Sequence, residues 1–151
     1  MSYVRIWIHA VWATKNRVAC LDTAIMSSLC DHIRSNARDK GLFVDTINGH
    51  LDHLHVLMLL KPEFSVAKQM QLIKGESSKW ASDTRLLPSD FAWESQYYAS
   101  SISGRSVPTV RKYIKNQQAH HASVTFATEF DHLVNSAGYS IDLPSGDELL
   151  G

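Results

Sequence analysis

Two histidines one residue apart are the side chains in this sequence best placed to bind a metal. His53 and His55 lie in "HLH", which leads into the apolar segment "VLMLL" at residues 56–60. Alternate residues of a strand point to the same face about 6.6 Å apart. Both imidazoles could therefore converge on one metal ion as neutral nitrogen ligands. The alternative is a pair of half-buried structural histidines, because a chain with 8 histidines contains this spacing readily by chance.

A tyrosine and a glutamine four residues apart form the second candidate group. We expect a helix over residues 105–121, on which Tyr113 and Gln117 share one face. A phenol and an amide oxygen could complete a two-histidine metal site suited to attack on a phosphodiester. An ordinary phenol, with a pKa near 10, needs such help, and a divalent cation would polarise the phosphate. The phosphotyrosine ester formed by this attack would preserve the energy of the phosphodiester bond, so that rejoining the DNA strand would need no ATP. The structural alternative is a core tyrosine and a solvated glutamine.

The hydropathy pattern predicts an α+β fold in one domain spanning residues 1–151. Alternation and helical spacing indicate strands at 3–14, 42–49 and 53–61, a short strand within 89–104, and helices at 22–41, 65–82, 105–121 and 125–138. The first six elements follow a split βαβ order. This order is typical of a ferredoxin-like or RNA-recognition-like (RRM-like) antiparallel sheet with helices on one face. The C-terminal helices would then carry the tyrosine. "NG" at 48–49 signals a hairpin with a connection longer than two residues.

Three segments together resemble a known family. They are "DHLHVLMLLKPEFSVAKQMQLIKGESSKW", "FAWESQYY" and "VRKYIKNQQAHH". They are similar, in this order, to the single-tyrosine insertion-sequence transposases of the His-hydrophobic-His (HUH) class, which include the REP-associated tyrosine transposases. The resemblance runs from about residue 3 to residue 140.

The resemblance implies a DNA transposase that cuts and rejoins single-stranded DNA through a 5′-phosphotyrosine intermediate. By position, Tyr113 would be the catalytic nucleophile, and the ligands of Mg²⁺ or Mn²⁺ would be His53, His55 and Gln117. It also implies a homodimer that recognises DNA hairpins near element ends, with active sites that can be shared between subunits. Two imidazoles and an amide oxygen suit Mg²⁺ or Mn²⁺ better than Zn²⁺.

The charge distribution is consistent with a nucleic-acid partner. The chain has 15 basic and 15 acidic residues, but residues 129–151 carry only acidic ones. A local cationic surface would bind a polyanion, although a solvated helix face explains the same charges. The candidate phosphate contacts are Lys74, Lys79, Arg85, Arg105, Arg111, Lys112 and Lys115. No apolar run approaches the length of a membrane span and no signal peptide is evident, so we expect a cytoplasmic protein. We expect Cys20 and Cys30 to be reduced and buried.

Several alternatives remain open. Other aromatic or phenolic candidates are Tyr97, Tyr98 and Tyr139, and other metal-ligand candidates are His50, expected in a turn, and His120 and His121. Asp52 could orient a histidine ligand, although an exposed turn aspartate is the simpler interpretation. For the whole chain, a non-catalytic, domesticated nucleic-acid-binding module on the same sheet is the main alternative. A histidine phosphoesterase would need repeated His-x-Ser/Thr motifs, which this sequence lacks.

Overall fold

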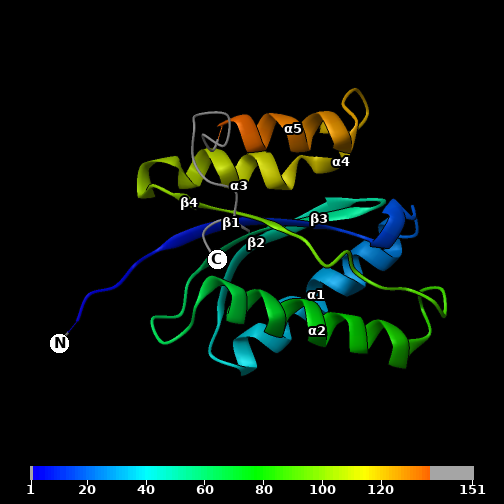
Figure 1. Ribbon diagram of the computed structural model, residues 1–151, viewed down its shortest axis with the longest axis horizontal. Helices are drawn as coiled ribbons and strands as arrows, with labels where there is room; N and C mark the ends of the chain where they lie inside the picture. Colours follow the sequence, from blue (N-terminus) through cyan, green and yellow to red (C-terminus); the bar gives the residue numbers. More distant parts are fainter. Residues whose placement is uncertain (1, 137–151) are drawn as a thin grey trace, which may run out of the picture. The chain divides into compact units, whose positions relative to one another are not determined.

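A four-stranded antiparallel sheet with the order β2-β3-β1-β4 organises the computed structural model, which describes residues 2–136 (Figure 1). The α+β, ferredoxin-like prediction is confirmed. The chain divides into two compact units, one that ends at Gln118 and one that begins at Ala119. The elements are β1 Trp7–Ala13, η1 Lys15–Arg17, α1 Thr23–Asp39, β2 Phe43–His50, β3 His53–Leu59, α2 Val66–Thr84, β4 Tyr98–Ile102, η2 Gly104–Ser106, α3 Val107–Lys115, α4 Gln117–His120 and α5 Phe126–Ser136.

Helices α1 and α2 cover one face of this sheet, and α3 lies on the other (Figure 1). The main core forms where Leu29 of α1 and Met70 of α2 meet Trp12, Val56 and Met58 of the central strands. Burying each such side chain stabilises the fold by about 1.5–3 kcal/mol. The helix on the opposite face, α3, is one of the C-terminal helices expected in addition to those on one face, and it carries Tyr113.

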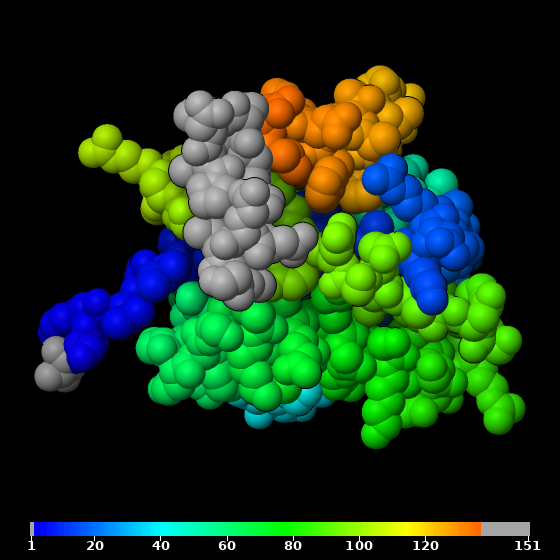
Figure 2. Space-filling model, in the orientation of Figure 1, coloured from blue at the N-terminus to red at the C-terminus, as the bar shows by residue number. Residues whose placement is uncertain are grey.

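The first strand begins later than the sequence pattern suggests. The predicted strand started at residue 3, but β1 starts at Trp7, and before it only Ile6 continues the pairing, accepting from the N–H of Leu60 at 2.8 Å. Figure 2 shows this N-terminal segment, in blue, extending away from the neighbouring residues. Its apolar side chains are accordingly exposed, with Tyr3 91% accessible.

The hairpin between β2 and β3 is tighter than predicted. Asn48 and Gly49 lie within β2, and the connection consists of two residues, Leu51 and Asp52. His50 is therefore the last residue of a strand, paired with His53, and not a turn residue. A Cβ on Gly49 would clash with the carbonyl oxygen of His53. Only glycine permits this close approach of the two strands.

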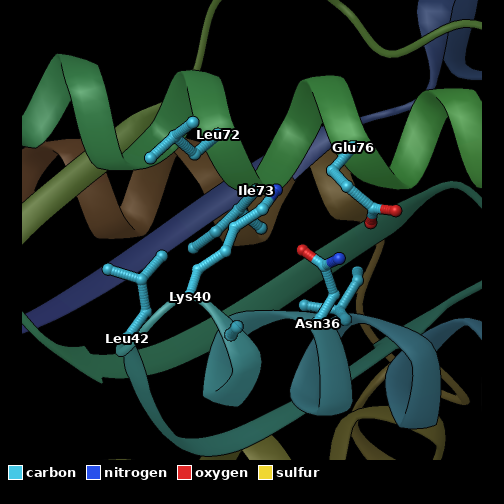
Figure 3. Close-up of a pocket in the computed structure, with 8 residues that line it drawn as sticks. Asn36, Lys40, Leu42, Leu72, Ile73 and Glu76 are labelled. Atoms are coloured by element: carbon cyan, nitrogen blue, oxygen red, sulfur yellow. The ribbon is translucent and has the colours of Figure 1, made fainter.

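The space between α1 and α2 is too small for a ligand. A cavity of about 10 Å³ lies there, which accommodates one water at most. Figure 3 shows Leu42, Leu72 and Ile73 among its lining residues, and Asn36 and Glu76 facing one another. Beside it, the His32 ring stacks on Trp80 of α2. The cavity is thus a packing feature of the interface between the two helices.

The two cysteines are free thiols, and both are partly buried. The prediction of reduced, buried cysteines thus holds for the free thiols, while the burial is only partial. Burial still raises the pKa of the Cys30 thiol to about 12, which makes it unreactive near neutral pH. Within residues 2–136, no helix has the length and hydropathy needed to cross a membrane.

Candidate active site

The candidate site occupies the face of the sheet that α3 covers. Along β3, Leu54, Val56 and Met58 point into the main core. The alternate residue Leu57 packs against Val107 and Ile114 of α3. His53 and His55 follow the same alternation, so they lie on the α3 face, where both are fully buried. This is the shared face that the one-residue spacing predicts.

Hydrogen bonding orients the His53 ring. Its Nδ1 lies 2.9 Å from Asp52 Oδ1, so the ring N–H donates to the carboxylate. Its Nε2 lies 3.1 Å from Oε1 of Gln117. Asp52 therefore holds the ring with its second nitrogen directed at the glutamine. Of the two interpretations of Asp52, the orienting one fits this geometry.

His9, which was not among the predicted site residues, holds the second histidine, His55. His9 Nε2 lies 2.9 Å from His55 Nδ1, and the two rings stack with centroids 5.2 Å apart. His9 is only 4% exposed. The alternation of side chains along β1 could have identified His9. Ile8 and Ala10 face the main core, so His9 must point to the opposite face.

The tyrosine lies against these histidines. The ring of Tyr113, which is half-buried, is 5.5 Å from that of His55 and 6.4 Å from that of His9, with edge-to-face geometry in both pairs. Its neighbour Ile114 is fully buried against Leu57. Packing of α3 on the sheet thus brings Tyr113 and Gln117 to the two histidines of β3.

The helix carrying these residues is not continuous as predicted. The helix expected over 105–121 begins at Val107, and Asn116 interrupts it between α3 and α4. The Nδ2 group of Asn48 donates to the carbonyl oxygens of Ile114 and Lys115, both at 3.1 Å. These bonds satisfy the last carbonyls of α3 and fix its end. Asn48 also exchanges two 3.0 Å bonds with Gln118, so β2 positions the chain on both sides of Gln117.

An ion pair attaches α3 to the edge strand β2. Arg111 Nε and Nη2 donate to the two carboxylate oxygens of Asp45 at 2.8 and 2.9 Å. The hydrogen bonds from Arg111 hold the pKa of Asp45 below its usual value. Bidentate pairs of this kind fix orientation as well as distance. Arg111, expected on a DNA-binding surface, therefore has a bond that positions the tyrosine helix.

The remaining basic candidates fall into two groups. Lys74 donates to the carbonyl oxygens of Glu94 and Ser95 at 2.6 and 3.2 Å and lies 5.6 Å from the centroid of the Tyr97 ring. Burial lowers its pKa. Lys74 thus holds the segment before β4. The candidates with exposed side chains are Lys79, Arg85, Arg105, Lys112 and Lys115.

The other tyrosines and histidines lie in varied settings. Tyr98 is buried in β4 and Tyr97 precedes it, 36% exposed. His120 and His121 belong to the C-terminal unit. Tyr139 and the end of the helix expected over 125–138 lie outside the described residues.

The donor set at the centre of the site fits a divalent cation. Because its Nδ1–H donates to Asp52, His53 can bind a cation through Nε2, and Oε1 of Gln117 lies 3.1 Å from that nitrogen. An imidazole nitrogen and an amide oxygen that converge in this way can both bind a divalent cation. His53, His55 and Gln117 are the residues that could hold it.

Comparison with known proteins agrees with this architecture. ISDra2 transposase TnpA from Deinococcus radiodurans is 25% identical over 114 residues, which cover 72% of this chain and 81% of that protein. A crystal structure of a candidate transposase from the same species has a TM-score of 0.61 and 23% identity, covering 78% of this chain and 95% of that chain. The REP-associated tyrosine transposase bound to a REP hairpin has a TM-score of 0.59 and 16% identity, covering 82% and 73%.

The family assignment comes from the sequence profile described as "Transposase IS200 like", which matches residues 2–117. This match includes the sheet, α3 and Gln117. A transposase is an enzyme that cuts DNA and transfers strands. The chain therefore belongs to the IS200-like transposase family.

Proposed function

We propose that this transposase cuts and rejoins single-stranded DNA with Tyr113 as its nucleophile. His53, His55 and Gln117 are the proposed ligands of Mg²⁺ or Mn²⁺. The observation that carries the proposal is the convergence of His53 Nε2 and Gln117 Oε1 at 3.1 Å, with Tyr113 against His55.

The proposed reaction is a transesterification at phosphorus. The phenolic oxygen of Tyr113 loses its proton and bonds to the phosphorus, and the bond from phosphorus to the 3′ oxygen breaks. The 3′ oxygen takes up a proton and leaves as a hydroxyl, while the 5′ phosphate stays on the tyrosine. When bound, the cation would polarise the phosphate oxygen and neutralise the developing charge. Attack by a 3′-hydroxyl on the ester reverses these steps and rejoins the strand.

The hydrogen-bonded neighbours of the histidines have a defined task in this proposal. Asp52 and His9 hold Nδ1 of His53 and of His55, each at 2.9 Å, so each ring would bind the cation through Nε2. Partners of this kind fix the tautomer and the ring orientation of a metal ligand. His9 and Asp52 are therefore positioning residues.

The remaining parts of the proposal concern partners and location. We expect hairpin-forming insertion-sequence ends as substrates, since a related fold is known bound to a REP hairpin. The exposed cations Lys79, Arg85, Arg105, Lys112 and Lys115 are the proposed phosphate contacts. We further propose that the whole chain acts as one transposase domain, in the cytoplasm and as a homodimer in which active sites can be shared. A non-catalytic binding module would not need Tyr113 beside His55.

Covalent capture tests this proposal. The purified protein is incubated with labelled single-stranded oligonucleotides from its genomic flanks, with Mn²⁺ or with a chelator. We expect an adduct that survives denaturation, depends on the metal and is lost in Tyr113→Phe. Tyr97→Phe is the matched control and should keep the adduct. Tight binding by folded protein without any adduct would instead favour the binding module.

A further inference from the structure

Three side chains that could hold a metal ion lie together in the C-terminal unit. Nε2 of His120 and Nε2 of His121 lie 3.1 Å from the two carboxylate oxygens of Glu129. One ligand atom from each residue lies within 4.8 Å of the others. The side chains of Glu129 and His121 are only 1% and 3% exposed. A charged group so deeply buried needs a strong partner.

The backbone fixes the tautomer of His121. Its Nδ1 lies 2.6 Å from the carbonyl oxygen of Val124, which can only accept, so Nδ1 carries a proton. In the neutral ring, Nε2 then presents a lone pair to Oε1 of Glu129, which also presents one. This contact is favourable only with a proton or a cation between the two atoms. A histidine that donates its other N–H to a backbone carbonyl is the usual form of a metal ligand.

The donor set indicates which cation would fit. Two imidazoles and one carboxylate, with a position left for water, are a set that zinc uses. Imidazole ligands favour zinc over magnesium, which prefers oxygen ligands. Neither His120 nor His121 is one of the proposed catalytic ligands His53, His55 and Gln117.

We propose that His120, His121 and Glu129 form a binding site for a zinc-like divalent cation, beyond the proposed strand-transfer activity. A bound ion would join the end of α4 to α5, since His120 closes α4 and Glu129 lies in the first turns of α5. The site would thus stabilise the C-terminal unit through metal binding.

Zinc titration of the full-length, metal-free protein tests the proposal. Competition with a chromophoric chelator gives the stoichiometry and affinity, and circular dichroism verifies that each variant is folded. We expect His121→Gln to bind one zinc ion fewer per chain, or to bind it about 100-fold more weakly or worse. His132→Gln is the matched control, because His132 is an exposed histidine on α5, the helix that carries Glu129. It should bind zinc as the unmodified protein does.

A second variant separates this site from the proposed catalytic one. The double variant His53→Ala/His55→Ala should keep the zinc ion that His121→Gln loses. The same ion should raise the Tm of the double variant and fail to raise that of Glu129→Gln. The proposal is overturned if folded His121→Gln binds zinc like the unmodified protein. It is also overturned if the folded double variant binds none, since all the histidines would then serve one site.

Discussion

Replacing His9 should weaken metal binding without disrupting the fold. His9→Phe keeps a ring of similar size in a site that is 4% exposed, so little cavity forms. It removes the 2.9 Å bond to Nδ1 of the fully buried His55. An unsatisfied buried donor costs about 1–3 kcal/mol. If that penalty falls on the metal-bound orientation of His55, Mn²⁺ affinity drops about 10–100-fold, since 1.4 kcal/mol is a factor of ten.

The assay is the Mn²⁺ concentration that gives half-maximal adduct formation on single-stranded DNA. We expect this concentration to rise in His9→Phe and the yield to recover at saturating Mn²⁺. His9→Gln, whose amide oxygen can accept from His55, should recover part of the affinity. His32→Gln removes a histidine from α1, on the other face of the sheet. It should leave the Mn²⁺ concentration for half-maximal adduct formation unchanged. An unchanged Mn²⁺ requirement in folded His9→Phe would refute the positioning role of His9.

Three further predictions concern the elements that hold the site. Asn48→Ala leaves two carbonyls at the end of α3 without their 3.1 Å donor bonds, so urea denaturation should show a loss of about 1–3 kcal/mol and adduct formation should slow. Because Arg111 lowers the pKa of Asp45, their pair stabilises fully above the unfolded aspartate pKa of about 3.9. That stability is lost as the pH falls through the lowered folded pKa, and Asp45→Asn should remove this part of the acid dependence; an identical acid dependence in the variant would contradict the assignment. Gly49→Ala should destabilise the fold by more than about 2 kcal/mol, through its clash in the hairpin. Gly75→Ala, in open space on α2, should stabilise by about 0.5–1 kcal/mol, and equal effects of the two would contradict the steric argument.

The sequence pattern was sufficient for the sheet and its central histidines. Alternation along β3 depends only on which side chains are buried, so it places His53 and His55 on one face and Leu54 on the other. The helix caps were also readable, since Asp22 accepts from the N–H of Ile25 at 2.9 Å, as its position before α1 predicts.

What the pattern could not provide depends on contacts between distant residues. The break at Asn116 follows from bonds that Asn48 makes to α3, 66 and 67 residues along the chain. The bond between His9 and His55 spans 46 residues and depends on the register of β1 against β3. The spacing of residues along the sequence gives no information on either of these two contacts. The predicted position of the hairpin turn was wrong for a related reason. Asn48 and Gly49 are still paired with β3, so the chain turns only after His50.

Identification of the residue that bonds to DNA tests the central claim most directly. The adduct formed with Mn²⁺ is trimmed with nuclease, digested with trypsin and analysed by mass spectrometry. Cleavage after Lys112 and Lys115 releases residues 113–115, "YIK", in which Tyr113 is the single tyrosine. We predict a nucleotide phosphate on this peptide. A nucleotide phosphate on the peptide that contains Tyr97 and Tyr98, with residues 113–115 unmodified, would contradict the assignment of Tyr113 as the nucleophile.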